Sequence, residues 1–310
     1  MIATQFAGII PPLCTPFHAD FTVDTGSLRR AIDFQLAAGV HGVFILGSSS
    51  EVAFLPDAQR RTAIETTVDQ VAGRVPVLVG CIDMTTLRVA EHVKTAEDCG
   101  ADAIVVTAPY YTRTHVAEIE EHFRLVHKMT ALPIFAYDIP IAVHSKLDRE
   151  MVLRLAEDDV IAGLKDSSGD DAGFRYVLLG KRDRGLDSFA VFTGSELVVD
   201  SVLAMGADGA VPGLGNIDPA GYVAIYDHCR AGDTAAARRE QERLMRLFTI
   251  TDVASPSRMG RGAAGLGSFK AAMKMRGLID NDVLAPPQPP LNDEELAQIR
   301  AKLREAGLLG

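Results

Sequence analysis

Short apolar runs recur at nearly even spacing along the first part of the chain. They lie at residues 7–13, 42–47, 76–81, 103–108, 133–138, 161–165, 189–193 and 208–212. Runs of this kind are typical of strands that are buried on both faces. Between most of them the apolar residues recur at helical spacing, as at Leu28, Ile32 and Leu36. The pattern therefore predicts alternating strands and helices.

A recurring glycine supports this alternation. Gly39, Gly100 and Gly206 each follow a helical pattern and precede a strand run. Glycine at such a joint suits the left-handed residue that ends a helix. Strands that alternate with helices are parallel, and eight units in about 215 residues fit a closed (β/α)8 TIM barrel. An open dinucleotide-binding sheet is disfavoured, because no Gly-x-Gly-x-x-Gly motif follows the first strand.

The strand signals stop after residue 218. Helical patterns follow at residues 222–230, 235–248, 268–276 and 293–308. Residues 256–267, rich in glycine and arginine, are expected to form a loop, and a proline-rich segment at 285–290 precedes the last helix. We predict a barrel over residues 1–218 and a C-terminal helical region over 219–310 that packs on it.

Composition narrows the function class. The 310 residues carry a net charge of −10, and no long basic stretch is present, which argues against nucleic-acid binding. Four scattered cysteines indicate a reducing compartment rather than disulfides. No run approaches the length of a membrane span, and the amino terminus lacks the pattern of a signal peptide. We expect a cytoplasmic protein with no membrane or nucleic-acid partner.

The sixth strand run ends in a lysine. Lys165 follows the apolar residues 161–164, and the carboxyl ends of barrel strands are where active sites lie. Burying an unpaired lysine is costly. Lys165 therefore either pairs with a carboxylate such as Asp138 or Asp166, or attacks a carbonyl carbon as a nucleophile. Tyr137, at the end of the fifth run, would then move protons to and from the reacting groups.

Hydroxyl groups follow two other runs. Three serines, residues 48–50, lie between Gly47 and Glu51. They either cap a following helix with Glu51 as the partner, or form a cradle for a carboxylate with backbone N–H groups. Tyr110 and Tyr111 follow the fourth run, where a tyrosine pair is commonly a packing or interface feature.

Taken in order, these motifs resemble the pyruvate-dependent class I aldolases grouped with dihydrodipicolinate synthase and N-acetylneuraminate lyase. The matching segments are residues 47–51, 109–111, 137–140, 163–169, 192–194 and 206–209. The resemblance implies Lys165 as the Schiff-base residue, Tyr137 as the proton shuttle, and Ser48 and Ser49 as binders of the pyruvoyl carboxylate. It also implies a homodimer or homotetramer in which Tyr111 reaches a neighbouring active site. No cofactor or metal is expected, because the imine itself activates the substrate.

Departures from the family patterns narrow the range of expected substrates. Ala142 stands where dihydrodipicolinate synthases have an arginine for the second substrate, and Glu196 is the one acid after Gly194 where sialic acid lyases have two. A shorter 2-oxo-3-deoxy acid is therefore expected. Gly194, Ser167 and Glu196 are expected to line the site of its hydroxyl groups, and His144 to bind a hydroxyl or a distal carboxylate.

The sequence thus predicts a Schiff-base aldolase or lyase. It would cleave, or form by condensation, a 2-oxo acid such as a 2-keto-3-deoxy sugar acid, with pyruvate and an aldehyde as partners. Three alternatives stay open: a 4-hydroxy-tetrahydrodipicolinate synthase with an altered loop, a 2-keto-3-deoxy acid dehydratase, and a silent relative that only binds a 2-oxo acid. Retention of both Lys165 and Tyr137 argues against the silent relative.

Overall fold

Eight parallel strands form the centre of the molecule. The computed structural model describes residues 6–310. Each strand overlaps one of the predicted apolar runs, and the sheet order is β1-β8-β7-β6-β5-β4-β3-β2. The strands are β1 (Gly8–Ile9), β2 (Val43–Ile45), β3 (Val77–Gly80), β4 (Ala103–Thr107), β5 (Ile134–Asp138), β6 (Gly163–Asp166), β7 (Ala190–Thr193) and β8 (Gly209–Ala210).

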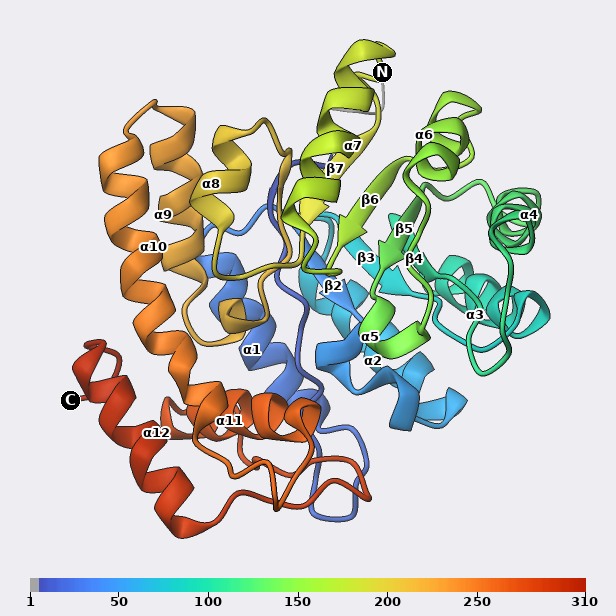
Figure 1. Cartoon of the computed structure of the whole chain (residues 1–310). Coiled ribbons are helices and arrows are strands. Elements are labelled where there is room, and N and C mark those ends of the chain that lie inside the picture. Colours follow the sequence, from blue (N-terminus) through green and yellow to red (C-terminus); the bar gives the residue numbers. More distant parts are fainter. Residues whose placement is uncertain (1–5) are drawn as a thin grey trace.

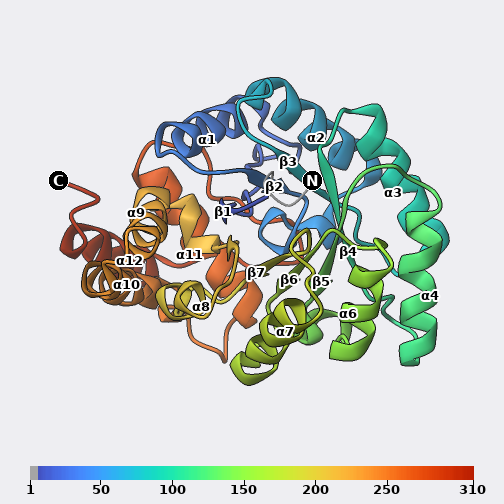
Figure 2. The ribbon, with the colours of Figure 1, turned by 90° about the horizontal axis from the view of Figure 1, so that it is seen from above.

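The two ends of this sheet meet and close a barrel. Pro12, just after β1, forms a parallel bridge with Phe44 of β2. The Leu13 N–H donates to the Phe44 carbonyl at 2.8 Å, and the Phe44 N–H donates to the Pro11 carbonyl at 3.0 Å. Figure 2 shows the helices arranged around the strands. The predicted (β/α)8 barrel is therefore confirmed.

Helices connect the strands and cover their outer side (Figure 1). The glycine joints are confirmed, because Gly39, Gly100 and Gly206 have φ values of 79°, 84° and 102°. Aspartates at 24, 148 and 170 accept backbone N–H bonds that begin three of the helices. The connecting helices are α1 (Thr25–Ala37), α2 (Asp57–Val71), α3 (Thr86–Asp98), α4 (Val116–His127), α5 (Pro140–Val143), α6 (Arg149–Glu157), α7 (Asp171–Asp183) and α8 (Val199–Ala204).

Four more helices complete the chain: α9 (Pro219–Arg230), α10 (Thr234–Phe248), α11 (Arg261–Met275) and α12 (Asp293–Glu305). The domain boundary at residue 218 stays a prediction, since α9 packs against β1 and α8 as well as α10. In Figure 1, α11 lies at the end of the barrel to which α5 belongs, beyond the carboxyl ends of the strands. None of the helices in residues 6–310 combines the length and apolar character needed to cross a bilayer.

The predicted loop over residues 256–267 is wrong in its second half. Helix α11 begins at Arg261, so the glycine-rich stretch forms its first turns. Glycine disfavours helices locally, but burial of Ala263, Ala264 and Gly267 against the rest of the protein outweighs this preference.

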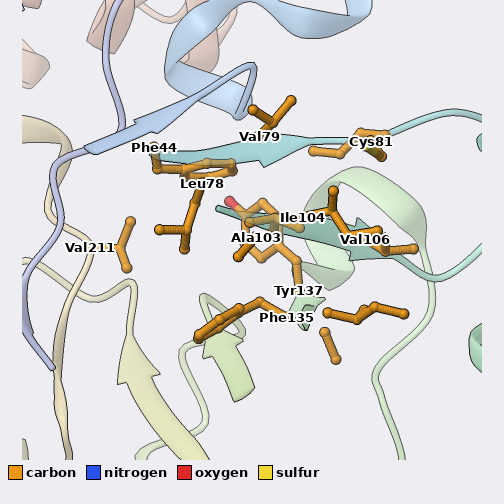
Figure 3. Close-up of a cluster of buried hydrophobic side chains, with 14 of the residues drawn as sticks. Phe44, Leu78, Val79, Cys81, Ala103, Ile104, Val106, Phe135, Tyr137 and Val211 are labelled. Atoms are coloured by element: carbon orange, nitrogen blue, oxygen red, sulfur yellow. The ribbon is translucent and has the colours of Figure 1, made fainter. Parts of the chain in front are cut away.

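Aromatic rings fill the barrel interior. Phe135 meets Phe6 at a centroid distance of 5.1 Å and Phe192 at 5.9 Å. One layer nearer the carboxyl ends, Phe44 meets Tyr137 edge to face at 6.4 Å (Figure 3). This apolar floor supports the side chains at the barrel mouth.

Candidate active site

Lys165 and Tyr137 lie side by side at the barrel mouth. They are register partners on β6 and β5, so their side chains leave the sheet on the same face. Lys165 is 5% exposed and Tyr137 is 3% exposed. The Lys165 Nζ lies 4.1 Å from the centroid of the Tyr137 ring and 4.7 Å from that of Phe44. The amine therefore rests between two aromatic faces.

The alternative in which Lys165 pairs with a nearby aspartate is contradicted. Asp138 and Asp166 follow Tyr137 and Lys165 by one residue and therefore point to the opposite face of the sheet. Both bind Lys146 instead: its Nζ pairs with Asp138 and lies 3.6 Å from the Asp166 Oδ2. Within residues 6–310, Lys165 has no carboxylate oxygen within 4.0 Å. The amine is left available for chemistry.

The serines after β2 form a short 3-10 helix, η1 (Ser48–Ser50), and not the start of an α-helix. The Ser48 Oγ lies 3.4 Å from the Tyr137 hydroxyl oxygen, within hydrogen-bond reach. Ser50 is buried, and its hydroxyl donates to the Leu13 carbonyl at 2.6 Å. Gly47, which precedes η1, has no side-chain cap. The capping interpretation is therefore wrong, while the exposed Ser48 and half-buried Ser49 can receive a ligand.

Glu51 joins the serine turn to the C-terminal region. It pairs with Lys270 of α11, and both side chains are completely buried. The Ala285 N–H and the Gln288 Nε2 each donate to the Glu51 Oε2 at 2.7 Å. Burial lowers the pKa of Lys270, and the Glu51 charge opposes that shift. The sequence interpretation missed Lys270, although a lysine inside the apolar stretch 269–273 carries the same signal as Lys165.

Unusual backbone conformations gather at the barrel mouth. Leu46, Glu51, Tyr111 and His144 have φ values between 57° and 74°, where side chains other than glycine are disfavoured. All four lie on the loops that follow β2, β4 and β5. Such conformations persist only where the surroundings hold them, and they are typical of functional sites.

Glu196 lies on the loop after β7 and faces the mouth. Its Oε1 accepts a hydrogen bond from the Leu214 N–H. Burial raises the pKa of Glu196 to about 7, against the opposing effects of that hydrogen bond and of the Lys165 charge. This carboxyl group can therefore act as a proton donor or as an acceptor near neutral pH.

The remaining predicted site residues lie on the loops after β4, β5, β6 and β7 and differ in their exposure to solvent. A Cβ on Gly194 would lie 1.9 Å from the Ser167 Oγ, so the absence of a side chain there lets the loops after β6 and β7 approach. His144 is exposed at the end of α5. Tyr111 is 90% exposed, and its hydroxyl makes no hydrogen bond within the described chain. The roles of these four residues stay predictions.

A cavity of about 670 Å³ opens at this end of the barrel. Ser48, Ser49 and Glu196 line it from the barrel, together with Ala142. Residues of α11 and of the proline-rich segment line the other side. The cavity is therefore built jointly by the barrel and the C-terminal region.

Comparisons with known proteins agree with this geometry. The model of the dihydrodipicolinate synthetase family matches residues 5–306. A probable 2-dehydro-3-deoxy-D-pentonate aldolase of Escherichia coli, YjhH, is 30% identical to this chain. The alignment covers 98% of this chain and 99% of YjhH. A 4-hydroxy-tetrahydrodipicolinate synthase of Methanopyrus kandleri is 32% identical, with 98% of both chains aligned.

Solved structures show the same relationship. The crystal structure of YagE, an Escherichia coli prophage protein in complex with pyruvate, has a TM-score of 0.90 and 30% identity, covering 98% of this chain and 99% of that one. A dihydrodipicolinate synthase from Bacteroides thetaiotaomicron also has a TM-score of 0.90, with 31% identity over 96% of this chain and 98% of that one. The fold and the family together define a class I lyase. The chain belongs to the dihydrodipicolinate synthetase family.

The raised pKa of Glu196 predicts a pH dependence of stability. Because its folded pKa of about 7 lies above the ordinary 4.5, the native protein binds more protons than the unfolded chain between these values. The contribution of Glu196 to stability therefore decreases as the pH rises through this window. The free energy of unfolding of Glu196→Gln, relative to that of wild type, should therefore be higher at about pH 8 than at about pH 5.

Urea unfolding of both proteins at the two pH values measures this gain. Glu305→Gln, at the exposed end of α12, is the matched control and should show no such change. An equal difference between Glu196→Gln and wild type at both pH values would contradict the raised pKa.

Proposed function

We propose that this protein is a Schiff-base aldolase that cleaves a 2-keto-3-deoxy sugar acid to pyruvate and an aldehyde. The observation that carries the proposal is the position of the Lys165 amine. It lies over the Tyr137 ring at the barrel mouth, with no carboxylate partner in residues 6–310. A buried lysine without a counter-ion is costly to maintain, and nucleophilic catalysis accounts for it.

The proposed reaction uses Lys165 and Tyr137 in turn. The Lys165 Nζ attacks the C2 carbonyl of the substrate, and loss of water from the carbinolamine gives an imine. Tyr137 removes the proton of the C4 hydroxyl, the C3–C4 bond breaks, and the imine accepts the electron pair as an enamine. The aldehyde leaves, C3 takes up a proton, and hydrolysis of the imine releases pyruvate and the free lysine.

Two serines hold the carboxylate of the substrate in this proposal. Ser48 and Ser49 line the cavity, and the Ser48 hydroxyl is within reach of the Tyr137 hydroxyl. A hydrogen bond between them would orient the phenol toward the reacting atoms. Tyr111, exposed on its loop, would complete the proton relay of a neighbouring subunit in a homodimer or homotetramer.

A short sugar acid suits the polar end of the cavity. Glu196, which lines the cavity, and Ser167 would bind its hydroxyl groups. The relative named as a probable 2-dehydro-3-deoxy-D-pentonate aldolase acts, by its name, on a compound of this class. The second candidate is a 4-hydroxy-tetrahydrodipicolinate synthase, the name of the Methanopyrus relative. Position 142 lines the cavity and holds an alanine, which has no guanidinium group to bind the carboxylate of a second substrate. This residue therefore disfavours the synthase.

A pyruvate-release assay across a panel of 2-oxo acids tests the proposal. We expect 2-keto-3-deoxy pentonate or hexonate to have a kcat/KM at least about tenfold above that of N-acetylneuraminate. Condensation of pyruvate with aspartate semialdehyde as the fastest reaction would instead assign a synthase. Water loss without pyruvate release would assign a dehydratase.

A further inference from the structure

The cavity at the barrel mouth has two chemically different ends. Its inner end carries the polar side chains Ser48, Ser49 and Glu196. Its outer walls come from the 3-10 helix η2 (Val52–Phe54), the end of α10, helix α11 and the proline-rich segment. The apolar side chains of these walls include Val52, Phe54, Phe248, Leu266, Phe269 and Pro287.

Apart from Arg261, which is 87% exposed and lies 4.0 Å from Asp252, the polar side chains of the outer cavity are engaged within the chain. The Gln288 amide donates to Glu51, and Glu51 is paired with the buried Lys270. The Thr251 hydroxyl donates to the Phe248 carbonyl at 3.0 Å. A polyol placed here would find few free hydrogen-bond partners, and its desolvated hydroxyls would be costly. The outer cavity therefore favours an apolar group.

Glycines keep one wall of the cavity open. Gly262 and Gly265 of α11 line it, and a Cβ at either position would meet no heavy atom within 4 Å. By contrast, a Cβ at Gly267, on the same helix, would lie 3.3 Å from the Leu291 side chain. Glycine within a helix is less favourable than alanine. At Gly265 no packing within the described chain requires it, so the space remains open.

The size of the cavity exceeds the needs of a small sugar acid. Its volume of about 670 Å³ lies in the range that holds drug-sized ligands. A two-carbon aldehyde bound at Ser48, Ser49 and Glu196 would occupy the polar end alone. The apolar walls begin directly beyond it, since Val52 and Phe54 follow the serine turn in the chain.

We propose that the protein also catalyses the addition of pyruvate to bulky apolar aldehydes, with aromatic aldehydes as the best fit. This inference rests on the proposed imine at Lys165. The pyruvate imine loses a C3 proton, and the resulting enamine forms a bond from C3 to the aldehyde carbon. The aldehyde oxygen takes up a proton by way of Tyr137, and hydrolysis of the imine releases 4-hydroxy-2-oxo-4-phenylbutanoate when benzaldehyde is used. No oxidant or reductant is needed.

Paired rate measurements with benzaldehyde and glycolaldehyde test this activity. Wild type, Gly265→Leu and the smaller control Gly265→Ala are each supplied with pyruvate and one aldehyde. The wild-type protein should form the phenyl adduct. Leucine fills the open wall, so the ratio of kcat/KM for benzaldehyde over glycolaldehyde should fall about tenfold or more, whereas alanine should change it less. Gly262→Leu provides a second filling variant at a different turn.

The possible outcomes separate this inference from the function on which it rests. If borohydride traps a pyruvate imine but wild type forms no phenyl adduct, the apolar site is overturned and the aldolase is not. An unchanged ratio in both leucine variants would also overturn it. If the leucine variants change the oligomeric mass and leave the ratio of kcat/KM values unchanged, the cavity would be assigned to a second copy of the chain. That result would also overturn the apolar aldehyde site. Failure to trap any imine would instead remove the proposed function itself.

Discussion

Replacing Lys165 by alanine is expected to lower kcat for pyruvate release by roughly four orders of magnitude or more. The reason is that, in the proposed mechanism, the imine carries the electron pair of the breaking bond, and no other described lysine lies over the Tyr137 ring. The nearby Lys146 is held by Asp138 and Asp166 on the other face of the sheet. Steady-state kinetics with the best substrate of the panel measure the loss.

Lys165→Arg is the matched control for charge. Arginine keeps a positive charge above the aromatic rings but does not form an imine with a ketone. It should therefore be as inactive as the alanine variant, provided that both keep the wild-type circular dichroism spectrum. An arginine variant that retains more than about one per cent of the wild-type kcat would show that charge and not covalent chemistry is required.

Replacing Lys270 by methionine is expected to cost about 3–5 kcal/mol of unfolding free energy. The change leaves the Glu51 carboxylate buried without its cation, between the serine turn and the proline-rich segment. The urea midpoint should fall by roughly 1 M. Catalysis should weaken as well, because Glu51 directly follows the serines that we propose to hold the carboxylate.

Two further variants separate the pair from general effects of substitution. Lys274→Met on the same helix removes a half-exposed partner of Asp282 and should cost less than about 1 kcal/mol. The double variant Lys270→Met with Glu51→Gln has no buried charge and should recover much of the lost stability. A Lys270→Met protein as stable as Lys274→Met would contradict the importance of this ion pair.

The sequence predicts the barrel well because its strands are buried on both faces. Each strand then appears as an apolar run, and the glycines at 39, 100 and 206 mark the joints between helix and strand. The local pattern predicts a loop over the first half of α11, because glycine disfavours helices. The burial that stabilises it comes from distant segments, which the local pattern does not contain.

The site could be predicted only in part, and for a physical reason. Lys165 stands out because a cation in an apolar strand is anomalous, and the pairing of β5 with β6 then places Tyr137 beside it. Lys270 presents the same anomaly in a helical stretch, yet its partner Glu51 lies more than two hundred positions away in the chain. The pairing of Lys146 with the two aspartates likewise depends on the register of adjacent strands and on a loop conformation.

Borohydride reduction in the presence of pyruvate tests the central claim most directly. The protein is incubated with pyruvate, reduced, digested and analysed by mass spectrometry, with Lys165→Ala treated in parallel. A reduced pyruvyl group on Lys165 alone, absent from the variant, is the predicted result. Reduced protein with no added mass, or with the group on Lys146 or Lys270 instead, would contradict the account.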